Sequence, residues 1–232
     1  SIKQNFNYKP SMAIKNNLEQ IKASLPANIT LVAVSKTKPI ADLMEAYHSG
    51  QRIFGENKIQ EMTEKWESMP KDIEWHMIGH VQTNKVKFMA KYVSLIHGVD
   101  SFKLLQEINK QAMKHQRTIN CLLQIHIAAE ETKFGIDVSE LDELLRSKAF
   151  KELKNIRITG LMGMATFTKN ESQIKNEFLD LKAIFDRLKS QPTTYNLEPS
   201  TLSMGMSGDY LLAIACGSTM VRIGSSIFGG RI

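Results

Sequence analysis

The stretch ITLVAVSK, residues 29–36, decides the fold class of this 232-residue chain. Its β-branched and apolar side chains are typical of a strand that is buried on both faces of a parallel sheet. Pro39 follows shortly after Lys36, and a proline cannot continue a central strand. We therefore expect a buried parallel strand over residues 29–35, with Lys36 at its carboxyl end.

Further short apolar segments follow this strand and alternate with stretches that have helical spacing. The expected strands are residues 29–35, 52–54, 73–78, 93–98, 120–128, 156–161, 201–203 and 220–223. The expected helices are residues 11–24, 40–48, 57–68, 84–91, 101–115, 139–146 (with Ser139 as N-cap), 171–188 and 208–215. This alternation predicts an α/β fold: a single (β/α)8 barrel of the TIM type with an extra N-terminal helix.

The composition indicates a cytoplasmic protein with one domain, residues 1–232. Hydrophobic residues make up 42% of the chain, and no run reaches the roughly 18 apolar residues that a membrane span needs. The N-terminus has no apolar signal core, and Cys121 and Cys216 lie in apolar runs, as reduced thiols do. The net charge is +6, but the 30 basic residues are dispersed and often stand beside acids. We therefore expect no membrane and no nucleic-acid partner.

Lys36 is the first candidate functional residue. Side chains alternate along a strand, so Val32, Val34 and Lys36 share one face. If that face points into the barrel, Lys36 lies at the mouth where active groups of such barrels gather. Burial lowers the pKa of a lysine, and the neutral amine attacks an aldehyde to form an imine. On position alone, a lysine that simply points to solvent is an equal alternative. We interpret Lys38, past the strand end, as a surface or entry-loop charge.

Two turns rich in glycine and serine predict a phosphate site. The eighth expected strand runs into Gly224 and Ser225 within CGSTMVRIGSSIFG, residues 216–229, and SMGMSGD, residues 203–209, follows the seventh. Phosphate is often held after these two strands of a TIM barrel, by backbone N–H groups and hydroxyls. Arg222 precedes the second turn, and we expect it either to donate to a pyridine nitrogen or to form a salt bridge in the barrel wall.

Six motifs in this order resemble the pyridoxal phosphate homeostasis proteins of the YggS/PROSC type, from about residue 10 to the end of the chain. They are SKTKP (35–39), FGEN (54–57), WHMIGHVQTNK (75–85), GLMGM (160–164), LSMGMS (202–207) and GSTMVRIGSSIFG (217–229). The resemblance implies a barrel similar to the N-terminal domain of bacterial alanine racemase. It also implies pyridoxal 5'-phosphate (PLP) as cofactor, held as an aldimine on Lys36.

The same resemblance assigns the other cofactor-binding residues. Arg222 would face the pyridine nitrogen, and Ser207, Gly224 and Ser225 would hold the phosphate. The ring pocket would be lined by Asn57, Met164 and Ser203. The chain departs from the family at His126, where relatives usually have asparagine, and at His80-Val81, so details of the pocket are open.

The resemblance favours a PLP carrier over an enzyme. Racemisation needs acid–base groups on both faces of the substrate carbon, and Lys36 supplies one. In alanine racemase the opposing tyrosine belongs to a further domain of a partner subunit, which we do not expect in this chain. We therefore expect a monomer that acts in intracellular vitamin B6 and amino-acid homeostasis, with PLP-dependent apoenzymes as recipients and without robust catalysis. We assign no catalytic residue and no metal; a weak racemase and a PLP-free Schiff-base lyase are the alternatives.

Overall fold

The computed structural model describes residues 12–192 and 194–230, and its centre is a closed barrel of eight parallel strands. The strands are β1 (Thr30–Val34), β2 (Ile53–Glu56), β3 (Glu74–Met77), β4 (Leu95–Val99), β5 (Ile119–Gln124), β6 (Ile156–Met162), β7 (Leu197–Ser203) and β8 (Met220–Ile223). Each strand pairs with the next one in sequence, and β8 closes the ring on β1. The predicted (β/α)8 class is therefore confirmed.

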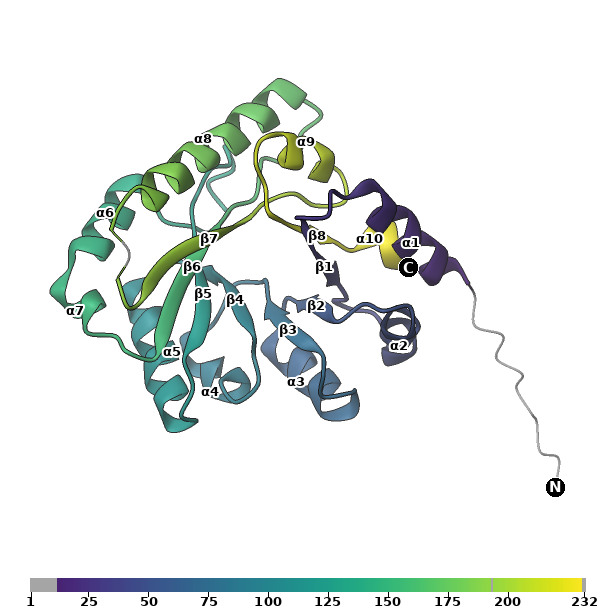
Figure 1. Cartoon of the computed structure of the whole chain (residues 1–232), viewed down its shortest axis with the longest axis horizontal. Coiled ribbons are helices and arrows are strands. Elements are labelled where there is room, and N and C mark those ends of the chain that lie inside the picture. Colours follow the sequence, from purple (N-terminus) through teal and green to yellow (C-terminus); the bar gives the residue numbers. More distant parts are fainter. Residues whose placement is uncertain (1–11, 193, 231–232) are drawn as a thin grey trace.

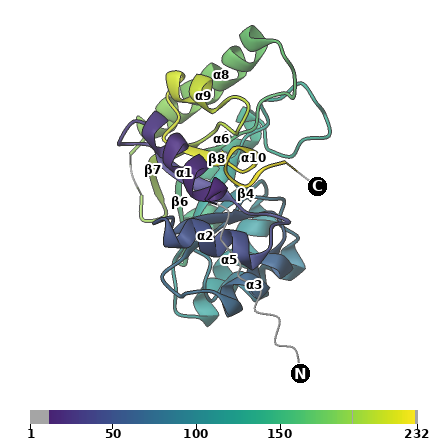
Figure 2. The same cartoon turned by 90° about the vertical axis from the view of Figure 1, so that its right-hand side faces the viewer.

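Helices surround the strands (Figure 1). They are α1 (Ala13–Ser24), α2 (Ile40–His48), α3 (Ile59–Ser68), α4 (Val86–Met89) after the 3-10 turn η1 (Thr83–Lys85), α5 (Phe102–Lys114), α6 (Val138–Arg146), α7 (Lys148–Lys151), α8 (Glu171–Lys189), α9 (Tyr210–Ala215) and α10 (Ser225–Phe228). The extra N-terminal helix α1 lies beside α10 in both views (Figures 1 and 2), where Asn17 Nδ2 donates to the Ile227 carbonyl at 3.0 Å. Within the described residues, no helix has both the length and the apolarity needed to cross a bilayer.

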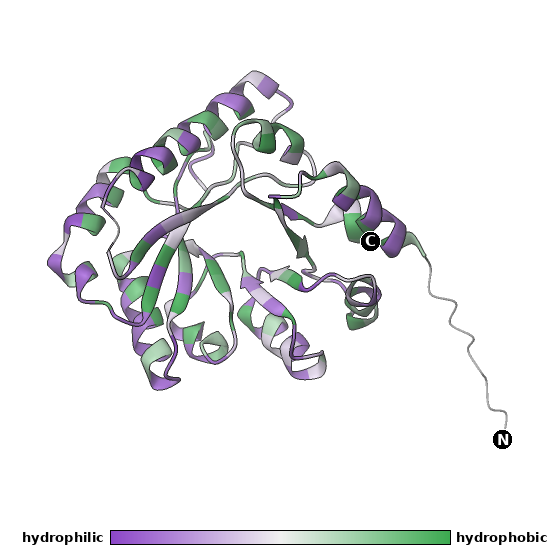
Figure 3. Cartoon of the chain, in the orientation of Figure 1, coloured by the Kyte–Doolittle hydropathy of each residue, from purple (hydrophilic) through white to green (hydrophobic). Residues whose placement is uncertain are grey.

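The two faces of strands β1, β4, β5, β6 and β8 pack into different cores. Outward residues such as Leu31 and Ala33 join the large core between strands and helices. Inward residues form a small separate cluster of Val32, Leu95, Leu122, Met162 and Met220. The surrounding helices alternate between hydrophobic and hydrophilic residues, as expected when one helix face packs on the barrel (Figure 3). Val32 points inward, and the alternation along β1 puts Val34 on the same face, two residues before Lys36.

Strand β7 begins four residues before the expected segment 201–203. The prediction missed this part because residues 198–200 are Glu-Pro-Ser, which is not typical of a strand. Ile158 pairs with Leu197 and Gly160 with Thr201, so the register shifts there and β7 contains extra residues. Pro199 lies in this irregular part, where the missing N–H of a proline is tolerated. Strand β5 is shorter than expected and ends at Gln124, after which only an isolated bridge between Ile125 and Ile136 continues the pairing.

The expected N-cap at Ser139 is wrong, and Asp137 caps α6 instead. The Glu140 N–H donates to Asp137 Oδ1 at 2.8 Å, and the Asp137 N–H donates to Glu140 Oε2 at 2.8 Å. This reciprocal pair satisfies two backbone donors of the first turn. The carboxylate three residues before Glu140 therefore determines where the helix begins.

Candidate functional site

A cavity of about 460 Å³ opens at the carboxyl ends of β1, β6, β7 and β8. This is the end of a (β/α)8 barrel at which ligands bind. Six of the eight residues assigned from the sequence line it: Lys36, Met164, Ser207, Arg222, Gly224 and Ser225. Residues from strand ends that are far apart in the chain therefore meet in one pocket of ligand size.

Lys36 lies in a tight turn directly after β1 and is half-buried. The next residue, Thr37, has φ 62°, which is uncommon for a residue with a side chain. Its N–H donates to Glu61 Oε1 at 2.6 Å, and on the other side of Lys36 the Ser35 hydroxyl donates to Glu56 Oε1 at 2.8 Å. The two neighbours of Lys36 are thus held by carboxylates from β2 and α3, which fixes the backbone that presents its amine.

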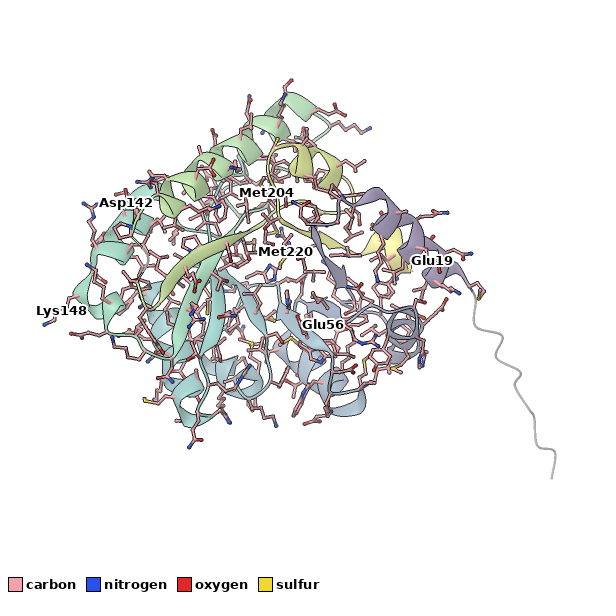
Figure 4. All side chains as sticks on the ribbon, viewed as in Figure 1. Glu19, Glu56, Asp142, Lys148, Met204 and Met220 are labelled. Carbon is pink, nitrogen blue, oxygen red and sulfur yellow. The ribbon has the colours of Figure 1, made fainter. Side chains whose placement is uncertain are left out.

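Both carboxylates are held by the buried ammonium group of Lys65 on α3. Lys65 Nζ donates to Glu56 Oε1 at 2.5 Å, to Glu61 Oε1 at 2.8 Å and to the Ser35 carbonyl at 2.8 Å. These bonds use the three donors of an ammonium group. We call Lys65, Glu56, Glu61 and Ser35 the Lys65 cluster; Figure 4 shows Glu56 in the interior of the fold. Burial raises the pKa of the Glu56 carboxyl, and the nearby Lys65 charge opposes that shift.

The two predicted phosphate turns lie against each other. Ser207 Oγ accepts from the Gly224 N–H at 3.3 Å and from the Ser226 N–H at 3.4 Å, so three polar groups converge on one point. A backbone hydrogen bond also links β8 to the turn after β7: the Arg222 N–H donates to the Gly205 carbonyl at 2.9 Å. Gly205 has φ +104°, in the left-handed region that favours glycine. This arrangement can receive an anion, because N–H groups and hydroxyls that converge favour negative charge.

Gly224 brings this cradle close to the strand that carries Lys36. A Cβ atom at Gly224 would lie 3.1 Å from both the Cβ and the carbonyl oxygen of Val34. A side chain there would be in tight contact with the end of β1. The glycine therefore favours the close approach between β1, which leads to Lys36, and the anion cradle.

Arg222 is buried on the floor of the cavity, with 3% of its surface exposed. Its guanidinium donates to Ser203 Oγ through Nη1 and to the Gly163 carbonyl through Nη2 at 3.1 Å. Burial lowers the pKa of Arg222 to about 10, and Asp209 acts in the opposite direction. The group is still charged at neutral pH and presents N–H donors where it borders the cavity.

The remaining two assigned residues lie beside this cavity. Ser203 is fully buried beneath Arg222 and contacts the guanidinium. Asn57 lines an adjoining cavity of about 750 Å³, which shares Lys36, Thr37 and Lys38 with the first. Lys36 therefore separates two spaces, and Asn57 faces the one on the far side from the cradle.

The sequence did not single out several residues that line the cavity. Lys133, from the loop after β5, donates to the Ala165 carbonyl at 2.6 Å and pairs with Glu130 at 3.1 Å. Asp209 holds the turn after β7 by accepting from the Met206 N–H at 2.7 Å. Lys38, which we interpreted as a surface or entry-loop charge, lines the cavity and donates to the Gly230 carbonyl at 3.0 Å. These residues follow strand ends, and that position could have indicated that they line the cavity. Charged loop residues usually point to solvent, however, so the position alone does not identify them.

The donor set of the cavity fits PLP. An amine can hold its aldehyde carbon, a buried guanidinium can donate to its ring nitrogen, and a cradle of N–H groups and hydroxyls can hold its phosphate. These three groups border one cavity whose volume is in the range of cofactor sites.

The fold and this cavity define a barrel of the alanine racemase N-terminal type, and the sequence profile of that family, "Alanine racemase, N-terminal domain", matches residues 11–232. The chain belongs to the pyridoxal phosphate homeostasis proteins within this class, which confirms the resemblance noted from its motifs. It is 38% identical to the pyridoxal phosphate homeostasis protein of Haemophilus influenzae, over 95% of this chain and 97% of the relative. It is 41% identical to that of Schizosaccharomyces pombe, over 88% and 85% of the two chains.

Solved structures extend the likeness. PipY of Synechococcus elongatus PCC7942, solved with PLP bound, has a TM-score of 0.84 and 33% identity and covers 93% of this chain and 100% of its own. Alanine racemase of Clostridium difficile 630 has a TM-score of 0.74 at 14% identity. This chain aligns with 57% of the racemase, so the likeness to the racemase concerns the barrel fold alone.

Proposed function

We propose that this chain carries PLP as a Schiff base on Lys36 and acts in intracellular PLP and amino-acid homeostasis. The observation that carries the proposal is the meeting of Lys36, Arg222 and the Ser207–Gly224 cradle around one cavity. Relatives that share more than a third of its residues are named for this function, and the related PipY was solved with PLP bound.

Each residue has a defined task in this proposal. When bound, PLP supplies an aldehyde for the Schiff base and a ring that withdraws electrons. Lys36 offers its amine from a turn fixed by the Lys65 cluster, and Ser207, Gly224 and Ser225 hold the phosphate. Arg222 donates to the ring nitrogen and, being charged, discourages its protonation. A ring kept unprotonated is a weaker electron sink than one paired with a carboxylate.

The tyrosines favour a carrier over a racemase. The hydroxyl of Tyr47 donates to Asp72 at 2.8 Å, that of Tyr92 pairs with Thr63 at 2.8 Å, and that of Tyr210 pairs with Ser24 at 3.1 Å. In the part of the chain that the structure describes, no tyrosine lines the cavity. A second acid–base group opposite Lys36 is therefore not supplied by these side chains.

The experiment is an absorption spectrum of the purified protein incubated with PLP, before and after borohydride. We expect a visible Schiff-base band that borohydride abolishes, and no such band with Lys36→Ala. Lys38→Ala, which removes the neighbouring amine, is the matched control and should keep the band. A colourless wild type in excess PLP would overturn the proposal and favour a PLP-free lyase. A chiral assay that detects D-amino acid formation dependent on Lys36 would favour the weak racemase.

We further propose that the protein works as a single-domain monomer in the cytoplasm and passes PLP to PLP-dependent apoenzymes. Cys121 and Cys216 are both buried free thiols, and burial raises the pKa of each, which suits a reducing compartment. Light scattering on a sizing column tests the oligomeric state. Recovery of activity by an apoenzyme mixed with the loaded protein, compared with an equal amount of free PLP, tests the transfer.

A further inference from the structure

Four buried polar side chains form a continuous hydrogen-bond chain along the interior of the barrel. Arg222 Nη1 contacts Ser203 Oγ, and His97 Nδ1 lies 3.0 Å from the same oxygen. His97 Nε2 in turn lies 2.9 Å from His76 Nδ1. The four residues come from β8, β7, β4 and β3 and are each at most 3% exposed. We call them the His97 chain.

The chemistry of the four groups sets one direction for its hydrogen bonds. A guanidinium can only donate, so Ser203 Oγ accepts from Arg222. The single proton of the Ser203 hydroxyl is then available to His97 Nδ1. If His97 Nδ1 accepts this proton, a neutral His97 carries its own on Nε2 and donates it to His76 Nδ1. The same logic leaves His76 with its ring proton on Nε2.

Both imidazoles are held in the neutral form. Burial lowers the pKa of His76 to about 3, and burial lowers the pKa of His97 well below its ordinary value, with further contributions from His76 and Arg222. A protonated imidazole would be a donor on both nitrogens and would reverse the hydrogen bond to Ser203. When both imidazoles are neutral, each hydrogen bond of the His97 chain is therefore donated in the direction from Arg222 to His76.

The His97 chain of hydrogen bonds ends, at His76, near the opposite mouth of the barrel. His76 borders a second, polar cavity of about 340 Å³, which is also lined by Thr30, Glu74 and Asn120 from the first residues of their strands. The His97 chain thus connects the cofactor end of the barrel with its amino-terminal end, passing beside the apolar interior cluster. A purely packed barrel interior would not need this row of polar groups.

We propose that His97 and His76 are positioning residues for the cofactor: by accepting the Ser203 hydroxyl proton, His97 leaves the lone pairs of Ser203 Oγ to Arg222, and this fixes the guanidinium so that its remaining donors face the ring nitrogen. The inference rests on the proposed function, in which PLP occupies the cavity above Arg222. It differs from that function in assigning a task to two histidines that do not border the cavity.

The first test needs neither a variant nor PLP. Long-range proton–nitrogen NMR spectra of the protein with 15N-labelled histidine report which ring nitrogen carries the proton. We expect His97 and His76 both to be neutral at pH 7 with the proton on Nε2. A proton on Nδ1 of His97 would overturn the inference, because the Ser203 hydroxyl would then accept at that bond.

The second test measures PLP binding by titration and by the position of the bound absorption band. His97→Leu removes both ring nitrogens, and we expect it to weaken PLP binding by on the order of tenfold and to shift the band. In His97→Gln an amide again offers one acceptor and one donor, so we expect affinity within about threefold of the wild type. His115→Leu, which changes an exposed histidine, is the matched control and should alter neither quantity.

The outcomes separate the two proposals. If the wild type binds no PLP, the proposed function fails, and the NMR experiment still shows in which direction the hydrogen bonds of the His97 chain are donated. If the wild type binds PLP but His97→Leu has the affinity and band position of His115→Leu, the positioning role alone is wrong. A band shift restored by His97→Gln supports it, because a general loss of packing would not follow hydrogen-bonding capacity.

Discussion

Two polar networks lie buried in this fold, and they differ in how their charges are paired. In the Lys65 cluster one ammonium group contacts two carboxylates, so every charge has a partner of opposite sign nearby. In the second network the guanidinium of Arg222 donates to Ser203 and to the Gly163 carbonyl, and the two neutral histidines of the His97 chain lie beyond Ser203. In the first network every charge is in contact with an opposite charge, whereas the second contains a charged guanidinium that borders the cavity.

The difference matches the two ends of the proposed ligand. The Lys65 cluster fixes the segment around Lys36, where a covalent bond is to form and the backbone must be rigid. The His97 chain fixes the Arg222 guanidinium, whose remaining N–H group is to donate to the ring nitrogen of PLP. Substitutions in the Lys65 cluster should therefore act mainly on folding stability, and substitutions in the His97 chain mainly on PLP binding.

The largest effect should come from Lys65→Met, which leaves Glu56 and Glu61 facing each other without their cation. Removing one partner of a buried ion pair costs about 3–5 kcal/mol. Urea denaturation should show this loss in the free energy of unfolding. Lys148→Met is the matched control, because the Lys148 side chain is 91% exposed and projects from the outside of the fold (Figure 4); it should change stability by less than about 0.5 kcal/mol. A loss below about 1 kcal/mol for Lys65→Met would break the comparison.

Acid should weaken the fold through the neutral histidines. The pKa of His76 falls from 6.5 to about 3 on folding, so below pH 6.5 the unfolded chain binds a proton that the folded chain does not. Stability contributed by His76 is therefore complete above pH 6.5 and falls as the pH drops toward 3, by about 2–3 kcal/mol at about pH 4.5. Glu56, with its raised pKa, acts in the opposite sense.

Urea midpoints measured across this pH window test that expectation. His76→Gln removes the titrating ring, and its stability should fall less steeply between pH 6.5 and about 4.5 than that of the wild type. Equal slopes for the two proteins would contradict a neutral buried His76.

Arg222→Leu should separate binding from stability. We expect PLP affinity to fall by roughly ten- to a hundredfold, since hydrogen bonds to charged groups contribute about 1.5–3 kcal/mol. The free energy of unfolding without PLP should fall by only about 1–2 kcal/mol, because the change also removes a buried charge that forms no hydrogen bond or ion pair with a carboxylate of the described residues. Paired titrations and urea curves measure both quantities, and a stability loss equal to that of Lys65→Met would show that the two networks do not differ.

The smallest effect should come from Ser207→Ala in the anion cradle. Loss of one neutral hydroxyl among several donors should weaken PLP binding by about 0.5–1.5 kcal/mol, which is roughly two- to tenfold. Fluorescence titration can resolve that change, and Ser172→Ala on the exposed face of α8 is the matched control. An unchanged affinity for Ser207→Ala would remove this residue from the phosphate site.

Much of this fold and part of the site could be predicted from local patterns in the sequence. The alternation of side chains on β1 places Lys36 on the inward face, and the turns after β7 and β8 can be recognised from glycine and serine alone. The His97 chain could not be found in that way, because its contacts depend on how β3 and β4 are registered, with Met77 opposite Ile96. Lys65 was equally hidden, since a lysine on an amphipathic helix normally faces solvent.

The central claim is that PLP is linked to Lys36. Among the described residues, three lysines border the cavity: Lys36, Lys38 and Lys133. The most direct measurement is borohydride reduction of the PLP-loaded protein, followed by proteolysis and mass spectrometry of the labelled peptides. We expect the pyridoxyl label on Lys36, with little on the other two lysines. A label found mainly on Lys38 or Lys133, or spread over surface lysines, would contradict the account.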